Sequence, residues 1–294
     1  MSLLNRRRFL SIAAAGGVLA GSPALAAAPS AFWKGRALGA GASMQLVGID
    51  NVDASAIFAR VEAEIVRLEK VFSLYLPDSE IARLNASGTL TGPSFDLLQV
   101  LSLSGRLNRA TDGAFDPTIQ PVWQAKATGA DAATAQDLVG WQHVQFDSAQ
   151  VRLGAGQSIT LNGIAQGYIT DKIAALLRAQ GLRDVLVDMG EVVGLGHRPD
   201  GTAWKMGVAA PDGTLLHRVQ LSDRALATSA ANGTVLADGP HILDPKGGRT
   251  AHGIVSVSAP SAALADGLST ALCLMDDAAA VLVHFPEAEL VLRA

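Results

Sequence analysis

The sequence has little cysteine, no block of basic residues and neither of two common hydrolase motifs. Cys273 is the only cysteine, so no internal disulfide can form. The formal net charge is −4 at pH 7, which gives no electrostatic case for binding nucleic acid. No Gly-x-Ser-x-Gly or His-Glu-x-x-His segment occurs, which argues against hydrolases built on a nucleophile elbow and against zinc peptidases of that type.

Long apolar runs are also scarce, and the clearest one lies near the N-terminus. Three consecutive arginines from Arg6 precede an alanine-rich stretch, and an Ala-x-Ala pattern ends at Ala26. This pattern predicts a twin-arginine signal peptide over residues 1–26 that directs export to the periplasm. Its removal takes away three arginines and no acidic residue, so the formal charge changes from −4 to −7. The alternative is an uncleaved membrane anchor, but the run is short and broken by glycine, so we expect no membrane span in the mature form.

The remaining residues, 27–294, contain no low-complexity linker, repeat or charge block, which favours one domain with two closely packed lobes. Helical spacing predicts a helix over 54–72 that Asp53 caps, and two further helices that begin after Ser79 and Ser94. Alternating segments at 204–209 and 215–221 predict antiparallel strands. Strands and helices mixed in this way indicate an α+β fold, not a regular doubly wound sheet.

The stretch 160–171 carries the first functional signal. A strand-like run over 151–159 turns through Gly163 and Gly167 into an amphipathic helix, which Gly181 ends. A glycine turn at the start of a helix exposes backbone amides at the positive end of the helix dipole, which suits a phosphate. The alternative is that the glycines only allow close packing of the helix on a sheet.

A second signal lies in the helix predicted over 262–274. Asp266, Ser269 and Thr270 are spaced i, i+3 and i+4, which puts a carboxylate and hydroxyls on one face. One carboxylate and one hydroxyl, completed by a backbone carbonyl and ligand phosphates, form a set of oxygen ligands for Mg²⁺. The alternative is an aspartate near the start of a helix with incidental polar neighbours.

Seven separated segments, which span nearly the whole of 27–294, carry a further signal. They are 72–85, 113–121, 163–168, 187–191, 227–229, 241–245 and 265–271. These segments resemble the ApbE family of FAD:protein FMN transferases and occur in the family's order. The resemblance implies a single two-lobed, T-fold-related α+β domain with mixed or antiparallel sheets and packed helices.

What the resemblance implies is an enzyme that binds FAD with Mg²⁺, joins FMN through a phosphoester to a Ser or Thr of a target protein and releases AMP. The metal would be held by the Gly163 carbonyl, Asp266 and Thr270. His241 is the candidate base for the acceptor hydroxyl, with a hydrogen bond to flavin or backbone as the alternative role. The implied FAD contacts are Leu38, Tyr75, Ala114, Phe115, Asp116, Thr160, Gln166, His241 and Ile242.

Some positions depart from the family pattern, because Leu38, Thr160 and Gln166 stand where the family usually has other residue types. The single glycine in 187–191 and the residue sequence of 162–168 most resemble the sequences of the exported NosX-like subgroup. Membership of that subgroup would imply a membrane-bound flavoprotein regulator of nitrous oxide reduction as the acceptor. Two alternatives remain, an Mg²⁺-dependent FAD pyrophosphatase and a non-catalytic periplasmic FAD-binding protein.

Overall fold

A seven-stranded sheet with the order β1-β2-β6-β7-β10-β13-β14 forms the centre of the protein, and every neighbouring pair is antiparallel. The computed structural model describes residues 28–294 except 211, 237–238, 249 and 251, so the predicted signal peptide lies outside the described residues. The α+β prediction is confirmed. The strands are β1 (Ser30–Ala37), β2 (Ala40–Val47), β6 (Val185–Asp188), β7 (Val192–Leu195), β10 (Arg224–Ala230), β13 (Ile254–Ala259) and β14 (Glu289–Arg293).

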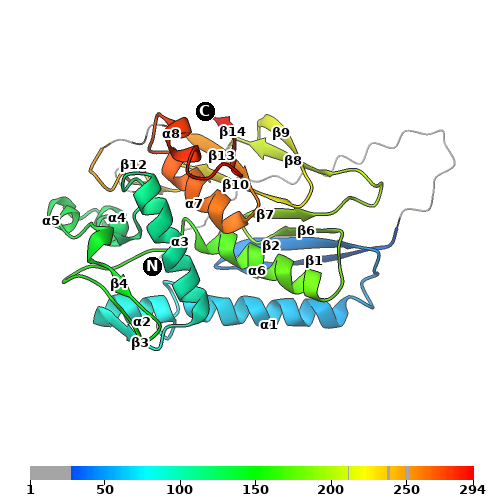
Figure 1. Cartoon of the computed structure of the whole chain (residues 1–294), viewed down its shortest axis with the longest axis horizontal. Coiled ribbons are helices and arrows are strands. Elements are labelled where there is room, and N and C mark those ends of the chain that lie inside the picture. Colours follow the sequence, from blue (N-terminus) through cyan, green and yellow to red (C-terminus); the bar gives the residue numbers. More distant parts are fainter. Residues whose placement is uncertain (1–27, 211, 237–238, 249, 251) are drawn as a thin grey trace.

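Three helices cover one face of this sheet: α1 (Ser55–Phe72), α6 (Ala165–Ala179) and α7 (Ala262–Leu272). Figure 1 shows α6 and α7 crossing in front of the strands, with α1 running along the lower side. Successive residues of a strand point to opposite faces, so Val185 and Val187 join the core beneath the helices. Leu186 instead packs against the antiparallel hairpin of β8 (Trp204–Ala209) and β9 (Leu215–Leu221) on the other face.

The second lobe lies beside the end of the sheet, on the left in Figure 1. It holds a small sheet of order β3-β5-β4, and its helix α3 contacts both α1 and α7. Its elements are α2 (Glu80–Ser87), β3 (Thr89–Thr91), α3 (Phe95–Ala110), η1 (Pro117–Ile119), α4 (Gln120–Thr128), α5 (Ala133–Gln136), η2 (Trp141–His143), β4 (Gln145–Phe146) and β5 (Gln150–Arg152). The remaining elements are β11 (Val235–Leu236), β12 (Gly239–Pro240) and α8 (Ala278–Leu282).

Two of the three predicted helix caps are confirmed. The hydroxyl of Ser79 accepts from the amide of Ala82, and that of Ser94 accepts from Leu97, so each satisfies an amide of its first helical turn. Asp53 was the wrong choice for α1, because Ala54 occupies the cap position and makes no side-chain cap bond. The carboxylate that organises this turn belongs to Asp50, which accepts from the amides of residues 52 and 53 at 2.9 Å.

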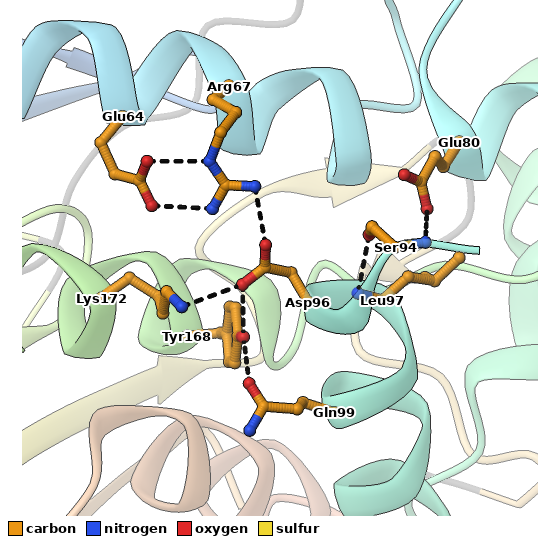
Figure 2. Close-up of polar contacts among 9 residues, drawn as sticks. All are labelled: Glu64, Arg67, Glu80, Ser94, Asp96, Leu97, Gln99, Tyr168 and Lys172. Atoms are coloured by element: carbon orange, nitrogen blue, oxygen red, sulfur yellow. Dashed lines mark hydrogen bonds and ion pairs between the residues drawn. The ribbon is translucent and has the colours of Figure 1, made fainter. Parts of the chain in front are cut away.

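A buried carboxylate ties three helices together (Figure 2). Asp96, in the first turn of α3, lies 2.7 Å from Arg67 of α1 and 3.1 Å from Lys172 of α6. It also accepts a hydrogen bond from the hydroxyl of Tyr168 on α6. The same hydroxyl lies 2.6 Å from the amide oxygen Oε1 of Gln99, so two acceptors share its one proton. The cluster therefore sets the positions of α1, α3 and α6 relative to one another.

Across the described part of the chain, none of the helices is both long enough and apolar enough to cross a membrane.

Candidate functional site

A cavity of about 270 Å³ lies where the end of the sheet meets the second lobe. The structure brings eleven of the twelve residues implied by the resemblance to its wall, although they come from five separate stretches of sequence. They are Tyr75, Ala114, Phe115, Asp116, Thr160, Gly163, Gln166, His241, Ile242, Asp266 and Thr270.

Leu38 is the exception, because it is not among the described residues that line the cavity. It occupies the turn between β1 and β2 with a φ of 46°, and its amide donates to Glu69 Oε1 at 2.8 Å. Ala40, two residues later, lines the cavity in its place. The implied contact of Leu38 with FAD therefore remains a prediction that this arrangement does not favour.

The three candidate metal ligands lie together. A side chain built on Gly163 would place its Cβ 2.9 Å from the hydroxyl oxygen of Thr270, so the glycine leaves room for a close approach of the two segments. Asp266 lies one helical turn before Thr270 and is 4% exposed. One of its carboxylate oxygens accepts from the amide of Gly167 at 3.1 Å.

Asp266 is buried, and its electrostatic surroundings include a second carboxylate, that of Asp171. Burial, with repulsion from Asp171, outweighs the hydrogen bond from Gly167 and raises the pKa of Asp266 to about 7. A divalent cation would favour the ionised form and restore the ordinary acidity.

The donor set fits Mg²⁺, which prefers carboxylate, hydroxyl and carbonyl oxygens such as those of Asp266, Thr270 and Gly163. Among the described residues, there is no group of three or more His, Cys, Asp or Glu side chains that could hold a metal. A softer ion such as zinc would require such a group, so the residues favour a hard cation that also binds substrate oxygens.

The start of α6 does not present its amides as the sequence pattern suggested. The amides of Ile164 and Ala165 donate to the carbonyl of Leu161, and that of Gly167 donates to Asp266. An anion would have to displace these bonds to reach the three amides, so binding of a phosphate at this turn stays a prediction. The positive end of the helix dipole instead supports the ionised carboxylate of Asp266.

Asp116 organises the loop that leads into the cavity. Its carboxylate accepts from the amide of Thr118 at 2.8 Å, from the hydroxyl of Thr118 at 2.6 Å and from the amide of Trp141 at 3.0 Å. Burial outweighs these bonds and raises the pKa of Asp116 above its ordinary value. The carboxylate thus holds the cavity wall through three bonds to the protein itself.

The neighbouring wall is fixed by Asn85, which sequence reasoning placed in a motif without a role. Its amide nitrogen donates to the carbonyl of Ile159, and its amide oxygen accepts from the Ile159 amide, both at 2.8 Å. The next amide, that of Thr160, donates to the carbonyl of Pro117 at 2.8 Å. The segment that carries Thr160 and Gly163 is therefore held between two parts of the second lobe.

Three backbone groups surround Nδ1 of His241. Nδ1 lies 2.9 Å from the carbonyl of Ala231 and 3.1 Å from that of Thr234, and the amide nitrogen of Thr234 lies farther away, at 3.4 Å. The two shorter contacts are to carbonyl oxygens, which can only accept, so they favour a proton on Nδ1, which in the neutral ring leaves the basic lone pair on Nε2. His241 is also one of the residues that line the cavity.

Several cavity residues were not assigned from the sequence. Glu191 is buried, and its carboxylate accepts from the amide of Thr228 at 3.1 Å. Glu191, Thr228 and Ser229 belong to segments that the resemblance included, so the signal was present without a role for each residue. Trp123 lies on α4, a helix that the sequence analysis did not predict because its apolar residues form no clear stripe.

The sequence of this chain resembles those of known proteins. The sequence model of the ApbE family matches residues 38–291. The chain is 27% identical to the FAD:protein FMN transferase of Klebsiella pneumoniae, over 86% of this chain and 81% of the relative. It is 30% identical to the FAD:protein FMN transferase of Treponema pallidum, over 74% and 71%.

Solved structures resemble the fold as well. The apo flavinyl transferase ApbE of Pseudomonas stutzeri has a TM-score of 0.76 and 27% identity, covering 86% of this chain and 87% of that one. The ApbE flavin transferase of Vibrio cholerae also has a TM-score of 0.76, at 24% identity, covering 87% and 90%.

Proposed function

Because this chain belongs to the ApbE family and is a transferase like its curated relatives, we propose that it moves FMN from FAD to a hydroxyl of a protein acceptor. The proposal includes Mg²⁺ dependence, a phosphoester link to Ser or Thr and release of AMP. Its main support is the convergence of Gly163, Asp266 and Thr270 at one cavity.

The residues on the wall divide into three roles. Asp266, Thr270 and the Gly163 carbonyl would hold the magnesium ion, which when bound offsets the negative charge of the FAD pyrophosphate. Tyr75 is exposed at the cavity wall, where its ring can stack on an aromatic part of FAD. The bonds of Asp116 and Asn85 keep the wall in place, so that little ordering is needed when FAD binds.

The transfer itself needs one base. The acceptor hydroxyl oxygen attacks the FMN phosphorus of FAD, the bond from that phosphorus to the bridging oxygen breaks, and AMP leaves with that oxygen. The proton of the hydroxyl passes to Nε2 of His241, whose Nδ1 proton is held by the carbonyls of Ala231 and Thr234. These steps require no oxidant or reductant.

The direct test incubates the chain with FAD, Mg²⁺ and a flavoprotein domain that carries a flavinylation threonine. We expect intact mass to show one FMN added to the acceptor, with AMP released and both lost in EDTA. Free FMN with AMP would instead identify a pyrophosphatase, and unchanged FAD would identify a carrier. Asp266→Asn, which keeps the shape of the side chain, should abolish the Mg²⁺-dependent signal, and full activity in it would refute the metal assignment.

We further infer that the enzyme acts in the periplasm after twin-arginine export, as the N-terminal segment indicates. The acceptor we infer is a membrane-bound flavoprotein that regulates nitrous oxide reduction, in keeping with the NosX-like features of segments 162–168 and 187–191. Fractionation of cells and mass analysis of flavin-linked peptides would test both points. Activity confined to the cytoplasm would exclude the first.

A further inference from the structure

A chain of hydroxyl groups lies behind the candidate metal site. Ser229, on β10, has its Oγ 3.2 Å from the Thr270 hydroxyl oxygen and 2.8 Å from the Ser269 hydroxyl oxygen. Ser269 in turn donates to the backbone carbonyl of Asp266 at 3.0 Å. Ser269 is fully buried and does not line the cavity, whereas Ser229 and Thr270 do.

The backbone carbonyl of Asp266, where the row of hydroxyl groups ends, decides the direction of every hydrogen bond in the row. A carbonyl oxygen can only accept, so the single proton of Ser269 is used on Asp266. At the contact between the two serines, Ser269 must therefore accept and Ser229 must donate. The proton of Ser229 is then used as well, so Ser229 can only accept from Thr270.

These bond directions fix the orientation of the Thr270 hydroxyl. Its proton points toward Ser229 and away from the cavity, so the lone pairs of its oxygen are available on the cavity side. A hydroxyl binds a cation through a lone pair, and its proton must point elsewhere.

We propose that Ser229 is a positioning residue, which accepts the Thr270 proton and thereby keeps the Thr270 oxygen oriented as a ligand for a divalent cation. The inference rests on the proposed function, since it concerns the same metal site. It explains why Ser269, on the same stripe of α7 as Asp266 and Thr270, is not itself a ligand: its hydroxyl fixes the direction of the chain.

The test measures the Kd for Mn²⁺ alone, by the paramagnetic resonance signal of the free ion, in the full mature chain without FAD. Loss of one hydrogen bond predicts that Ser229→Ala raises this Kd about fivefold. In a Thr270→Ala background, the same change should have no further effect, because the residue through which Ser229 acts is gone. An equal rise in both backgrounds, or no rise in either, would overturn the proposal.

Ser256→Ala is the matched control. Ser256 is a fully buried serine on the adjacent strand β13, and its hydroxyl lies 2.8 Å from that of Thr228 instead of Thr270. We expect its Kd for Mn²⁺ to match that of the wild type, and a rise equal to that of Ser229→Ala would count against the proposal.

If Ser229→Ala does not fold, Ser269→Ala carries the test. Without Ser269 as acceptor, the Ser229 proton turns to the Thr270 oxygen and occupies one of its lone pairs, so the Kd should again rise, and an unchanged Kd overturns the proposal. A wild-type chain that binds no Mn²⁺ would remove the metal assignment and this inference together. If the wild type binds Mn²⁺ but the effects of Ser229→Ala and Thr270→Ala on the Kd are additive, only this inference is overturned and the metal assignment stands.

Discussion

The hydroxyl of Tyr168 lies 2.7 Å from the buried carboxylate of Asp96 and donates its proton to it. Tyr168 lies in the first turn of α6. This helix begins two residues after Gly163 and carries Gln166 near its start. Asp96 is also paired with Arg67 of α1 (Figure 2). The helix that supplies part of the cavity wall is therefore anchored on its far side to the second lobe.

Removal of this hydroxyl should destabilise the protein without opening a large cavity. Tyr168→Phe takes away one hydrogen bond to a charged acceptor, so we expect the free energy of unfolding to fall by about 1.5–3 kcal/mol. Urea unfolding would measure the change. Tyr75→Phe serves as the control, because Tyr75 is 70% exposed, and it should alter stability by less than about 0.5 kcal/mol. Equal stability of Tyr168→Phe and the wild type would show that the bond is not formed.

The pH dependence of the free energy of unfolding should reflect the ionisation of the Asp96 carboxylate. Burial by itself raises the pKa of Asp96, but hydrogen bonds from Arg67, Tyr168 and Lys172 together outweigh it and hold the pKa below its ordinary value. The folded state therefore binds fewer protons than the unfolded state around the ordinary pKa of about 4. This contribution is present above that pH and is lost as the pH falls through the lower, folded pKa.

Asp96→Asn tests this sign. The stability difference between wild type and Asp96→Asn should be largest at neutral pH and should shrink as the pH is lowered below about 4. Urea midpoints measured from pH 7 to pH 3 would show the convergence. A difference that stays constant over that range would mean that the charge of Asp96 contributes nothing.

Gly167 should not tolerate any side chain. A Cβ at this position would lie 2.3 Å from the carbonyl oxygen of Ala262, where α6 crosses α7. Backbone cannot move aside cheaply, so Gly167→Ala should lower the free energy of unfolding by about 3 kcal/mol or more. Gly253→Ala is a fair control, since its Cβ would meet only an ordinary contact of 3.5 Å with Ala294. If Gly167→Ala and Gly253→Ala had the same melting temperature, the close contact between α6 and α7 at Gly167 would be contradicted.

Local patterns predicted much of this fold because the relevant signals lie within a few residues of each other. The caps at Ser79 and Ser94 and the strands β8 and β9 follow from neighbours in sequence, and the structure has them where expected. Asp53 failed as a cap because a second aspartate three residues earlier, Asp50, competes for the same turn. Residue type alone does not decide between two such carboxylates.

The site shows the same limit more sharply. Helical spacing put Asp266, Ser269 and Thr270 on one face, and the structure brings Asp266 and Thr270 to the cavity. The hydroxyl of Ser269 turns instead toward Ser229, forty residues earlier in the chain. That partner is set by the packing of α7 on β10, which no local pattern encodes.

The variant Asp116→Asn tests whether the Asp116 carboxylate contacts FAD directly or only supports the loop at the cavity wall. Asp116→Asn keeps one acceptor oxygen but places an amide group opposite a backbone amide of Thr118 or Trp141, both of which donate. One buried amide without an acceptor costs about 1–3 kcal/mol, so the variant should lose stability of that order. Its affinity for FAD, followed by flavin fluorescence without metal, should fall because the loop is displaced. Asp112→Asn, an exposed carboxylate four residues earlier, should leave stability within about 0.5 kcal/mol of the wild type. If Asp116→Asn kept full stability and still lost FAD binding, the carboxylate would contact FAD directly, and its three bonds to the loop would be secondary.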